Sequence, residues 1–129
     1  METLKKIAIY MDHFTANLIE YKKTANLIET IHSDFNHLEK VKILQKGESH
    51  LHNKEQDLQN KFYLEISNNS VDYSQILLFG PTNSKTEFKI VLENDKRFIN
   101  REIVLKITDK LTPNEQIAFV NECFYLDTI

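Results

Sequence analysis

The side chains best suited to binding a phosphate gather between positions 46 and 54. They are Lys46, Gly47, His50, His52 and Lys54. Lysine and histidine side chains donate hydrogen bonds to phosphate oxygens, and a glycine lets the backbone come close to one. Two interpretations stay open at this point: a phosphate-binding loop, or a solvated, flexible loop that leads into a helix.

Metal and thiol chemistry are less favoured. His50 and His52, together with Asp12 and His13, contain enough ligand types for zinc. However, alternate residues of an extended loop point to opposite sides, and histidine is common on protein surfaces, so we expect no metal site. The one cysteine, Cys123, excludes an internal disulfide framework, and its place beside the apolar stripe of a helix indicates packing.

Acidic residues near the ends of the expected strands raise the question of a two-metal nuclease. The candidates are Asp12, Glu55, Asp57 and Asp109. Two-metal cleavage needs several carboxylates that converge on the ions. The apolar run 76–79 ends without a carboxylate, so this chemistry is not expected.

The turn from Gly80 to Lys85 joins a strand to a helix. Free N–H groups at a helix start can hold a phosphate, but Pro81 removes one of them and the glycine spacing of a phosphate-binding loop is absent. A capped turn is the favoured interpretation, with Ser84 and Glu87 as a capping box. Lys85 in the first helical turn opposes the helix dipole, which hints at a partner for its ammonium group.

The first quarter of the chain predicts strands. Residues 4–11, 17–22 and 26–32 are rich in apolar, β-prone side chains and are joined by short polar connections. The hexapeptide Thr-Ala-Asn-Leu-Ile-Glu occurs at both 15–20 and 24–29. A repeat at this short distance indicates two similar strands, so we predict an antiparallel meander of three strands.

The remainder predicts alternating helices and strands. A polar loop is expected over 33–53, with a short strand at 38–44 as an option, and a helix over 52–67 on the stripe Leu51, Leu58, Phe62 and Ile66. The apolar run 75–79 predicts a strand buried on both faces. A helix from Ser84, a strand over 102–108 and a last helix, opened by the capping box Thr112 to Glu115 with Pro113 in its first turn, complete the order.

The element order β-β-β-α-β-α-β-α predicts an α/β fold with a mixed five-stranded sheet, of the ribonuclease-H-like or translational-machinery-component-like type. Crossover helices should make the last two strands parallel to a neighbour. The 129 residues correspond to a single domain, 1–129.

Charge and composition restrict the function only partly. The chain holds 16 basic against 19 acidic residues, a net charge of -3, which argues against a generic nucleic-acid binder but allows a local basic face. No apolar run approaches the roughly 18 residues that suggest a membrane span. A single cysteine fits the cytoplasm.

Two segments carry a family resemblance. Residues 7–20 read Ile-Ala-Ile-Tyr-Met-Asp-His-Phe-Thr-Ala-Asn-Leu-Ile-Glu, and residues 76–85 read Ile-Leu-Leu-Phe-Gly-Pro-Thr-Asn-Ser-Lys, followed by Phe88 and Leu92. They resemble the central domain of archaeal and eukaryotic class-one peptide-chain release factors and of the ribosome-rescue factor Pelota, a group with small bacterial relatives. In that family a later strand ends in a Gly-Pro-x-x-x-Lys-like turn that opens a helix. The resemblance covers most of 5–126 in element order.

One departure from the family concerns catalysis. Release factors carry Gly-Gly-Gln in the loop before the first long helix, whereas the matching stretch 44–54 has Gly47 followed by Glu48. The paired glycines and the water-positioning glutamine are absent, so peptidyl-tRNA hydrolysis by that route is not expected. The resemblance implies a lone, non-enzymatic, translation-related domain without a cofactor that docks on the ribosome or other structured RNA.

The predicted RNA contacts are Lys46, Gly47, His50, His52, Lys54 and Lys85, with Lys5, Lys6, Lys22 and Lys23 as further candidates at the ends of the meander. The acidic composition and the apolar edge of the meander favour another class, a protein-interaction domain or homodimer without a nucleic-acid role. A metal-dependent hydrolase is a third alternative, and it requires bound metal.

Overall fold

The computed structural model describes residues 5–34 and 48–125, with side chains described from 55 in the second range. The strands are β1 (Lys6–Met11), β2 (Thr15–Lys22), β3 (Thr24–His32), β4 (Gln75–Gly80) and β5 (Glu102–Ile107). The helices are α2 (Glu48–Asn68), α3 (Ser84–Glu93), the short 3-10 helix η1 (Lys96–Phe98) and α4 (Pro113–Tyr125). None of the described helices is both long and apolar enough to cross a membrane.

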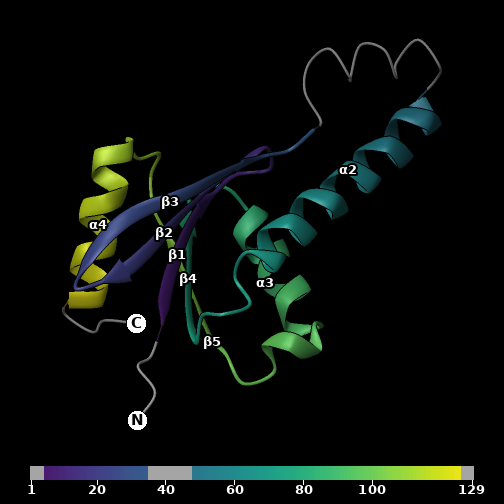
Figure 1. Ribbon diagram of the computed structural model, residues 1–129. Coiled ribbons are helices and arrows are strands. Elements are labelled where there is room, and N and C mark those ends of the chain that lie inside the picture. The colour runs from purple at the N-terminus through teal and green to yellow at the C-terminus, as the bar shows by residue number, and fades with distance from the viewer. Residues whose placement is uncertain (1–4, 35–47, 126–129) are drawn as a thin grey trace.

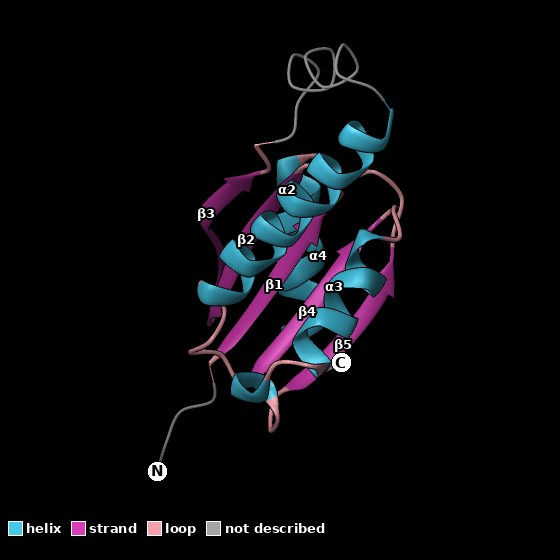
Figure 2. Cartoon of the chain, turned by 90° about the vertical axis from the view of Figure 1, so that its right-hand side faces the viewer, coloured by secondary structure: helices cyan, strands magenta, loops and turns pink. Residues whose placement is uncertain are grey.

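The strands form one mixed sheet in the order β3-β2-β1-β4-β5. The meander β1-β2-β3 is antiparallel, and β4 runs parallel to both β1 and β5. Helices α2 and α3 cover one face of the sheet and α4 covers the other (Figures 1 and 2). The predicted five-stranded α/β architecture, with both late strands parallel to a neighbour, is confirmed.

The interior strand β4 divides the core into two layers. Ile76 and Leu78 pack in the cluster under α2 and α3, whereas Leu77 and Phe79 pack under α4, and all four are fully buried. This alternation confirms the predicted strand with two buried faces. Cys123 is 5% exposed in the α4 layer, as its expected packing role requires.

Helix α2 has three residues of its predicted apolar stripe in the core, the side chain of Leu51 lies outside the described part, and the helix starts earlier than predicted. Leu58, Phe62 and Ile66 are buried against the sheet. The helix begins at Glu48 rather than near His52. No glycine or proline occurs between Gly47 and the helix end, so nothing interrupts propagation back to that point. The optional strand at 38–44 lies outside the described residues.

One predicted capping box is present and the other is wrong. The Thr112 N–H donates to Glu115 Oε1 at 2.9 Å, and the Glu115 N–H donates to Thr112 Oγ1 at 3.2 Å. At α3, the helix follows Asn83, which makes no side-chain cap. Ser84 is fully buried instead, and its hydroxyl shares a 2.8 Å hydrogen bond with the Thr82 hydroxyl.

The two hairpin turns of the meander are tighter than predicted. Strands β2 and β3 begin at Thr15 and Thr24, two residues before the predicted starts. In the first turn, the Asp12 carboxylate accepts the backbone N–H groups of Phe14 at 2.7 Å and of Thr15 at 2.8 Å. This Asx-type turn satisfies donors that an open loop would leave to water.

Candidate nucleic-acid interface

Four lysines meet at the end of the sheet where β1 begins and β2 ends. Lys5, Lys6, Lys22 and Lys23, named here the lysine cluster, line a pocket of about 460 Å³. Antiparallel pairing brings them together, because the register sets Lys6 opposite Tyr21 while the following two lysines form the β2-β3 turn. The meander lysines considered from the sequence therefore form one surface.

The charge at this pocket is mainly positive. Glu20 is the only acidic side chain among the described lining residues, and its carboxylate lies 3.5 Å from Lys22 Nζ. It also accepts a hydrogen bond from the Tyr73 hydroxyl. Burial, followed by this bond, raises the pKa of Tyr73 above its ordinary range, so the phenol stays a neutral donor. Four ammonium groups thus face a single, already engaged carboxylate.

Aromatic rings support one of the four lysines. Lys6 Nζ lies 5.9 Å from the Tyr21 ring centroid and 5.6 Å from that of Phe124. The two rings pack against each other at 5.2 Å. These cation-π contacts hold the ammonium of Lys6 beside the pocket.

Lys23 occupies a strained position at the tip of the β2-β3 turn. Its φ angle is 68°, in the left-handed region, and it is the one non-glycine residue with positive φ in the described chain. Glycine or asparagine would fit this conformation at lower energy. A long cationic side chain at a strained turn is a reason to look for function there.

The predicted turn contact Lys85 is not part of this surface. It is the second residue of α3 and is 4% exposed, and its ammonium group donates to the Thr82 carbonyl oxygen. Burial lowers the pKa of Lys85. The partner expected from its dipole-opposing position is therefore this carbonyl, and little of the side chain is open to a phosphate.

Those of the predicted contacts between 46 and 54 that the structure describes lie at the other end of the molecule. His50, His52 and Lys54 belong to the start of α2 rather than to a loop, and Lys46 and Gly47 lie outside the described residues. The start of α2 and the lysine cluster are at opposite ends of the sheet (Figure 1). No set of three potential metal ligands gathers within the described part of the chain.

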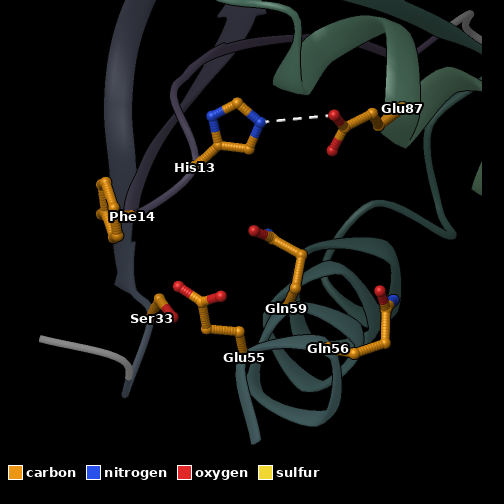
Figure 3. A pocket seen from close by; sticks show the side chains of 7 residues that line it. All are labelled: His13, Phe14, Ser33, Glu55, Gln56, Gln59 and Glu87. Atoms are coloured by element: carbon orange, nitrogen blue, oxygen red, sulfur yellow. Dashed lines mark hydrogen bonds and ion pairs between the residues drawn. The ribbon is translucent and has the colours of Figure 1, made fainter. Parts of the chain in front are cut away.

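A second, polar pocket was not predicted from the sequence. It has a volume of about 340 Å³ and lies between the β1-β2 turn, α2 and α3. Figure 3 shows its described lining residues, His13, Phe14, Ser33, Glu55, Gln56, Gln59 and Glu87. We refer to this site as the polar pocket. The available signal was Phe14, an aromatic side chain in an otherwise polar turn.

Glu87 accepts hydrogen bonds that hold one wall of the polar pocket in place. The Tyr63 hydroxyl donates to Glu87 Oε1 at 2.8 Å, and His13 Nε2 lies 3.4 Å from Glu87 Oε2. Burial, then the bond to this carboxylate, raises the pKa of Tyr63 above its ordinary range. The contact with His13 is long and partly exposed, so its main effect is to orient the imidazole.

Comparison with known proteins identifies the fold. No protein-family model matches the chain, and no curated protein sequence matches it. Among solved structures, Pelota of Archaeoglobus fulgidus matches with a TM-score of 0.60 and 11% identity, covering 95% of this chain and 32% of that one. Pelota of Thermoplasma acidophilum matches with a TM-score of 0.59 and 13% identity, covering 94% and 34%.

An archaeal translation termination factor, aRF1, has the same arrangement, with a TM-score of 0.55 and 13% identity over 92% of this chain and 34% of that one. The chain therefore spans about a third of the length of these proteins. The resemblance predicted from the sequence is confirmed for the fold. The chain has an α/β fold similar to that of part of Pelota and of aRF1.

Proposed function

We propose that this chain is a non-enzymatic, translation-related module that binds ribosomal or other structured RNA. The observation that carries the proposal is the convergence of the lysine cluster on one pocket, in a chain whose net charge is -3. The fold shared with Pelota and a translation termination factor supports the assignment to translation. The RNA role is supported by the charge and geometry of the cluster.

The cluster suits the phosphate backbone of RNA more than a base. Lysine ammonium groups act as point charges that neutralise phosphates and release counterions. Lys5, Lys22 and Lys23 are exposed. They can reach successive phosphates without first breaking a buried interaction, and Lys6 is already positioned by its aromatic neighbours.

A second contact region belongs to the same proposal. His50, His52 and Lys54 belong to the first part of α2, which starts at the end of the sheet opposite the lysine cluster, and Lys46 precedes them in the sequence. An RNA surface that engages both ends would be about as long as β1, whose six residues span roughly 20 Å. The two regions are therefore testable separately.

The decisive experiment measures RNA affinity as a function of salt. Anisotropy of a labelled RNA hairpin is followed from about 50 to 200 mM KCl, a range in which several phosphate contacts change affinity strongly. The test variant is Lys22→Gln/Lys23→Asn, because asparagine accepts the left-handed turn position. The control, Lys89→Gln/Lys110→Gln, removes the same charge away from the cluster.

We expect the cluster variant to weaken binding and to reduce the slope of log affinity against log salt by about 1.4 to 1.8, for two lost phosphate contacts. The control should keep the parent slope. Lys46→Ala/Lys54→Ala tests the second region in the same assay, and co-sedimentation with ribosomes tests the translation assignment. Absence of salt-sensitive binding by the parent protein would overturn the proposal.

An exposed apolar strand favours a second candidate, a protein-interaction or dimeric domain. Strand β3 lies at the sheet edge, with Leu27 51% and Ile28 47% exposed. Edge strands offer unpaired backbone groups to another chain. Light scattering after size exclusion distinguishes the two candidates: a stable dimer that Leu27→Lys dissociates supports this one, and a monomer at all concentrations opposes self-association.

A further inference from the structure

We propose that the polar pocket binds an unstacked nucleobase, so that the protein reads RNA bases at one end of its sheet and phosphates at the other. This inference rests on the proposed RNA function and adds a site of different chemistry. It follows from four features of the pocket: an exposed ring, polar groups without a partner among the described residues, a described lining without lysine or arginine, and size.

The ring belongs to Phe14. It is 53% exposed on the wall formed by the β1-β2 turn, and Figure 3 shows it beside the opening. The two hydrogen bonds from the backbone to Asp12 hold this turn, so the ring is presented by a fixed backbone. Proteins that bind single-stranded RNA stack unpaired bases on rings exposed in this way.

The opposite wall supplies a hydrogen-bonding edge. Glu55 and Gln59 are one helical turn apart on α2, and Figure 3 shows both directed into the pocket. Glu55 has no hydrogen bond or ion pair with any described residue, and Gln59 Nε2 is buried without a partner among them. Figure 3 shows the amide oxygen of Gln59 toward the pocket, and turning the amide over would put its nitrogen in that place. Acceptor and donor together match the polar edge of a base.

The charge of the described lining favours a base over a phosphate. The described lining holds the carboxylates of Glu55 and Glu87 and no lysine or arginine. A phosphate would be repelled there, whereas the uncharged edge of a base can donate an N–H to a carboxylate. The volume of about 340 Å³ falls at the small end of the ligand-pocket range, roughly 300 to 1,000 Å³.

Hydrogen bonds hold one wall of the polar pocket in place. Glu87 is held by the Tyr63 hydroxyl and in turn orients His13, which closes the side opposite Glu55 in Figure 3. These residues therefore position the wall, and the contacts with the base come from Phe14, Glu55 and Gln59.

The test titrates isotope-labelled full-length chain with adenosine, cytidine, guanosine and uridine, followed by backbone and side-chain amide NMR signals. Ribose 5-phosphate is the probe for backbone binding, and N-acetyl-arginine amide is the probe for a cationic peptide. We expect saturable shifts at Phe14 and at the Gln59 side-chain amide with at least one nucleoside, insensitive to salt. Shifts at these groups with the arginine probe alone, or with none of the probes, overturn the inference.

Variants connect the shifts to the stacking ring. Phe14→Ala should weaken nucleoside binding by about 5- to 150-fold, the range for loss of one stacking contact. Tyr125→Ala, which removes an aromatic ring with 80% exposure elsewhere, should change nothing. Equal affinity of Phe14→Ala and the parent overturns the inference. Because Phe14 is exposed, its removal should not unfold the protein, which circular dichroism checks.

The outcomes separate this site from the proposed function. Salt-sensitive RNA binding that depends on Lys22 and Lys23, without any nucleoside shift, refutes the base pocket and keeps the RNA module. Nucleoside binding in a protein whose RNA affinity does not depend on those lysines supports the pocket and refutes the lysine cluster as the RNA contact.

Discussion

Replacing Lys23 by glycine should stabilise the fold while weakening RNA binding. At φ 68° a side chain-bearing residue costs roughly 1–2 kcal/mol, which glycine avoids. The greater conformational freedom of glycine in the unfolded chain offsets about 0.5–1 kcal/mol of this gain in stability. We therefore expect the free energy of unfolding to rise by about 0.5–1 kcal/mol, and the melting temperature by about 2–4 °C for a domain of this size.

The matched control is Lys22→Gly, one residue earlier. Lys22 ends β2 in extended conformation and pairs with Thr24, so glycine there should lower stability by about 0.5–1 kcal/mol. Both variants remove one ammonium group from the lysine cluster, and each should reduce the salt slope of RNA binding by about 0.7 to 0.9.

The measurements are urea denaturation followed by circular dichroism and the anisotropy titration with the RNA hairpin. If Lys23→Gly raises and Lys22→Gly lowers the free energy of unfolding, while both weaken RNA binding equally, the strain at the turn is linked to function. If Lys23→Gly destabilises the protein as much as Lys22→Gly does, the strain argument is refuted. If neither variant alters RNA binding, these lysines are not the RNA contacts.

Three further predictions concern stability and ionisation. Gly80→Ala should destabilise by at least about 2 kcal/mol in urea denaturation, since a Cβ at φ 142° would lie 2.7 Å from a backbone oxygen of β1. Thr112→Ala should cost about 1 kcal/mol by loss of the helix cap. The Thr112 backbone N–H, followed by the Thr112 side chain, lowers the pKa of Glu115, so this carboxylate's contribution to stability is present at neutral pH and is lost on acidification through that lowered pKa. Alanine keeps the backbone N–H, so a denaturation series with pH should show an acid loss that is only partly reduced in Thr112→Ala. Tyr63 and Tyr73 have raised pKa values, so their contribution to stability is complete below about pH 10 and is lost at higher pH. Ultraviolet titration of the Tyr63→Phe variant should lack one of the late transitions of the parent protein.

Local sequence signals were sufficient for most of the fold. The apolar run before Gly80 predicted a doubly buried strand, and Thr112, Pro113 and Glu115 predicted the start of α4. These signals work because strand burial and helix capping involve residues close together in the chain. The Ser84 capping box was wrong because a residue far away in the sequence engages one of its two side chains. The Tyr63 hydroxyl, 24 residues away, donates a hydrogen bond to Glu87.

The candidate sites depended more on pairing across the chain. The lysines at positions 5, 6, 22 and 23 were visible as candidates, but only the β1-β2 register and the β2-β3 turn place them around one pocket. The polar pocket could not be predicted, because Phe14 and Glu87 are brought together by elements that are far apart in sequence. Lys85 had the right residue type for a phosphate contact, but the folded structure leaves it only 4% exposed.

The repeated hexapeptide shows which properties depend on the local sequence and which depend on the tertiary structure. Thr-Ala-Asn-Leu-Ile-Glu forms a strand at both 15–20 and 24–29, so the sequence by itself determined the local conformation. The environments differ: Leu18 is fully buried in β2, which has neighbours on both sides, whereas the equivalent Leu27 is 51% exposed in the edge strand β3. Backbone preference comes from the side chains themselves, but burial depends on which elements lie above and beside a strand. Only the tertiary structure decides that.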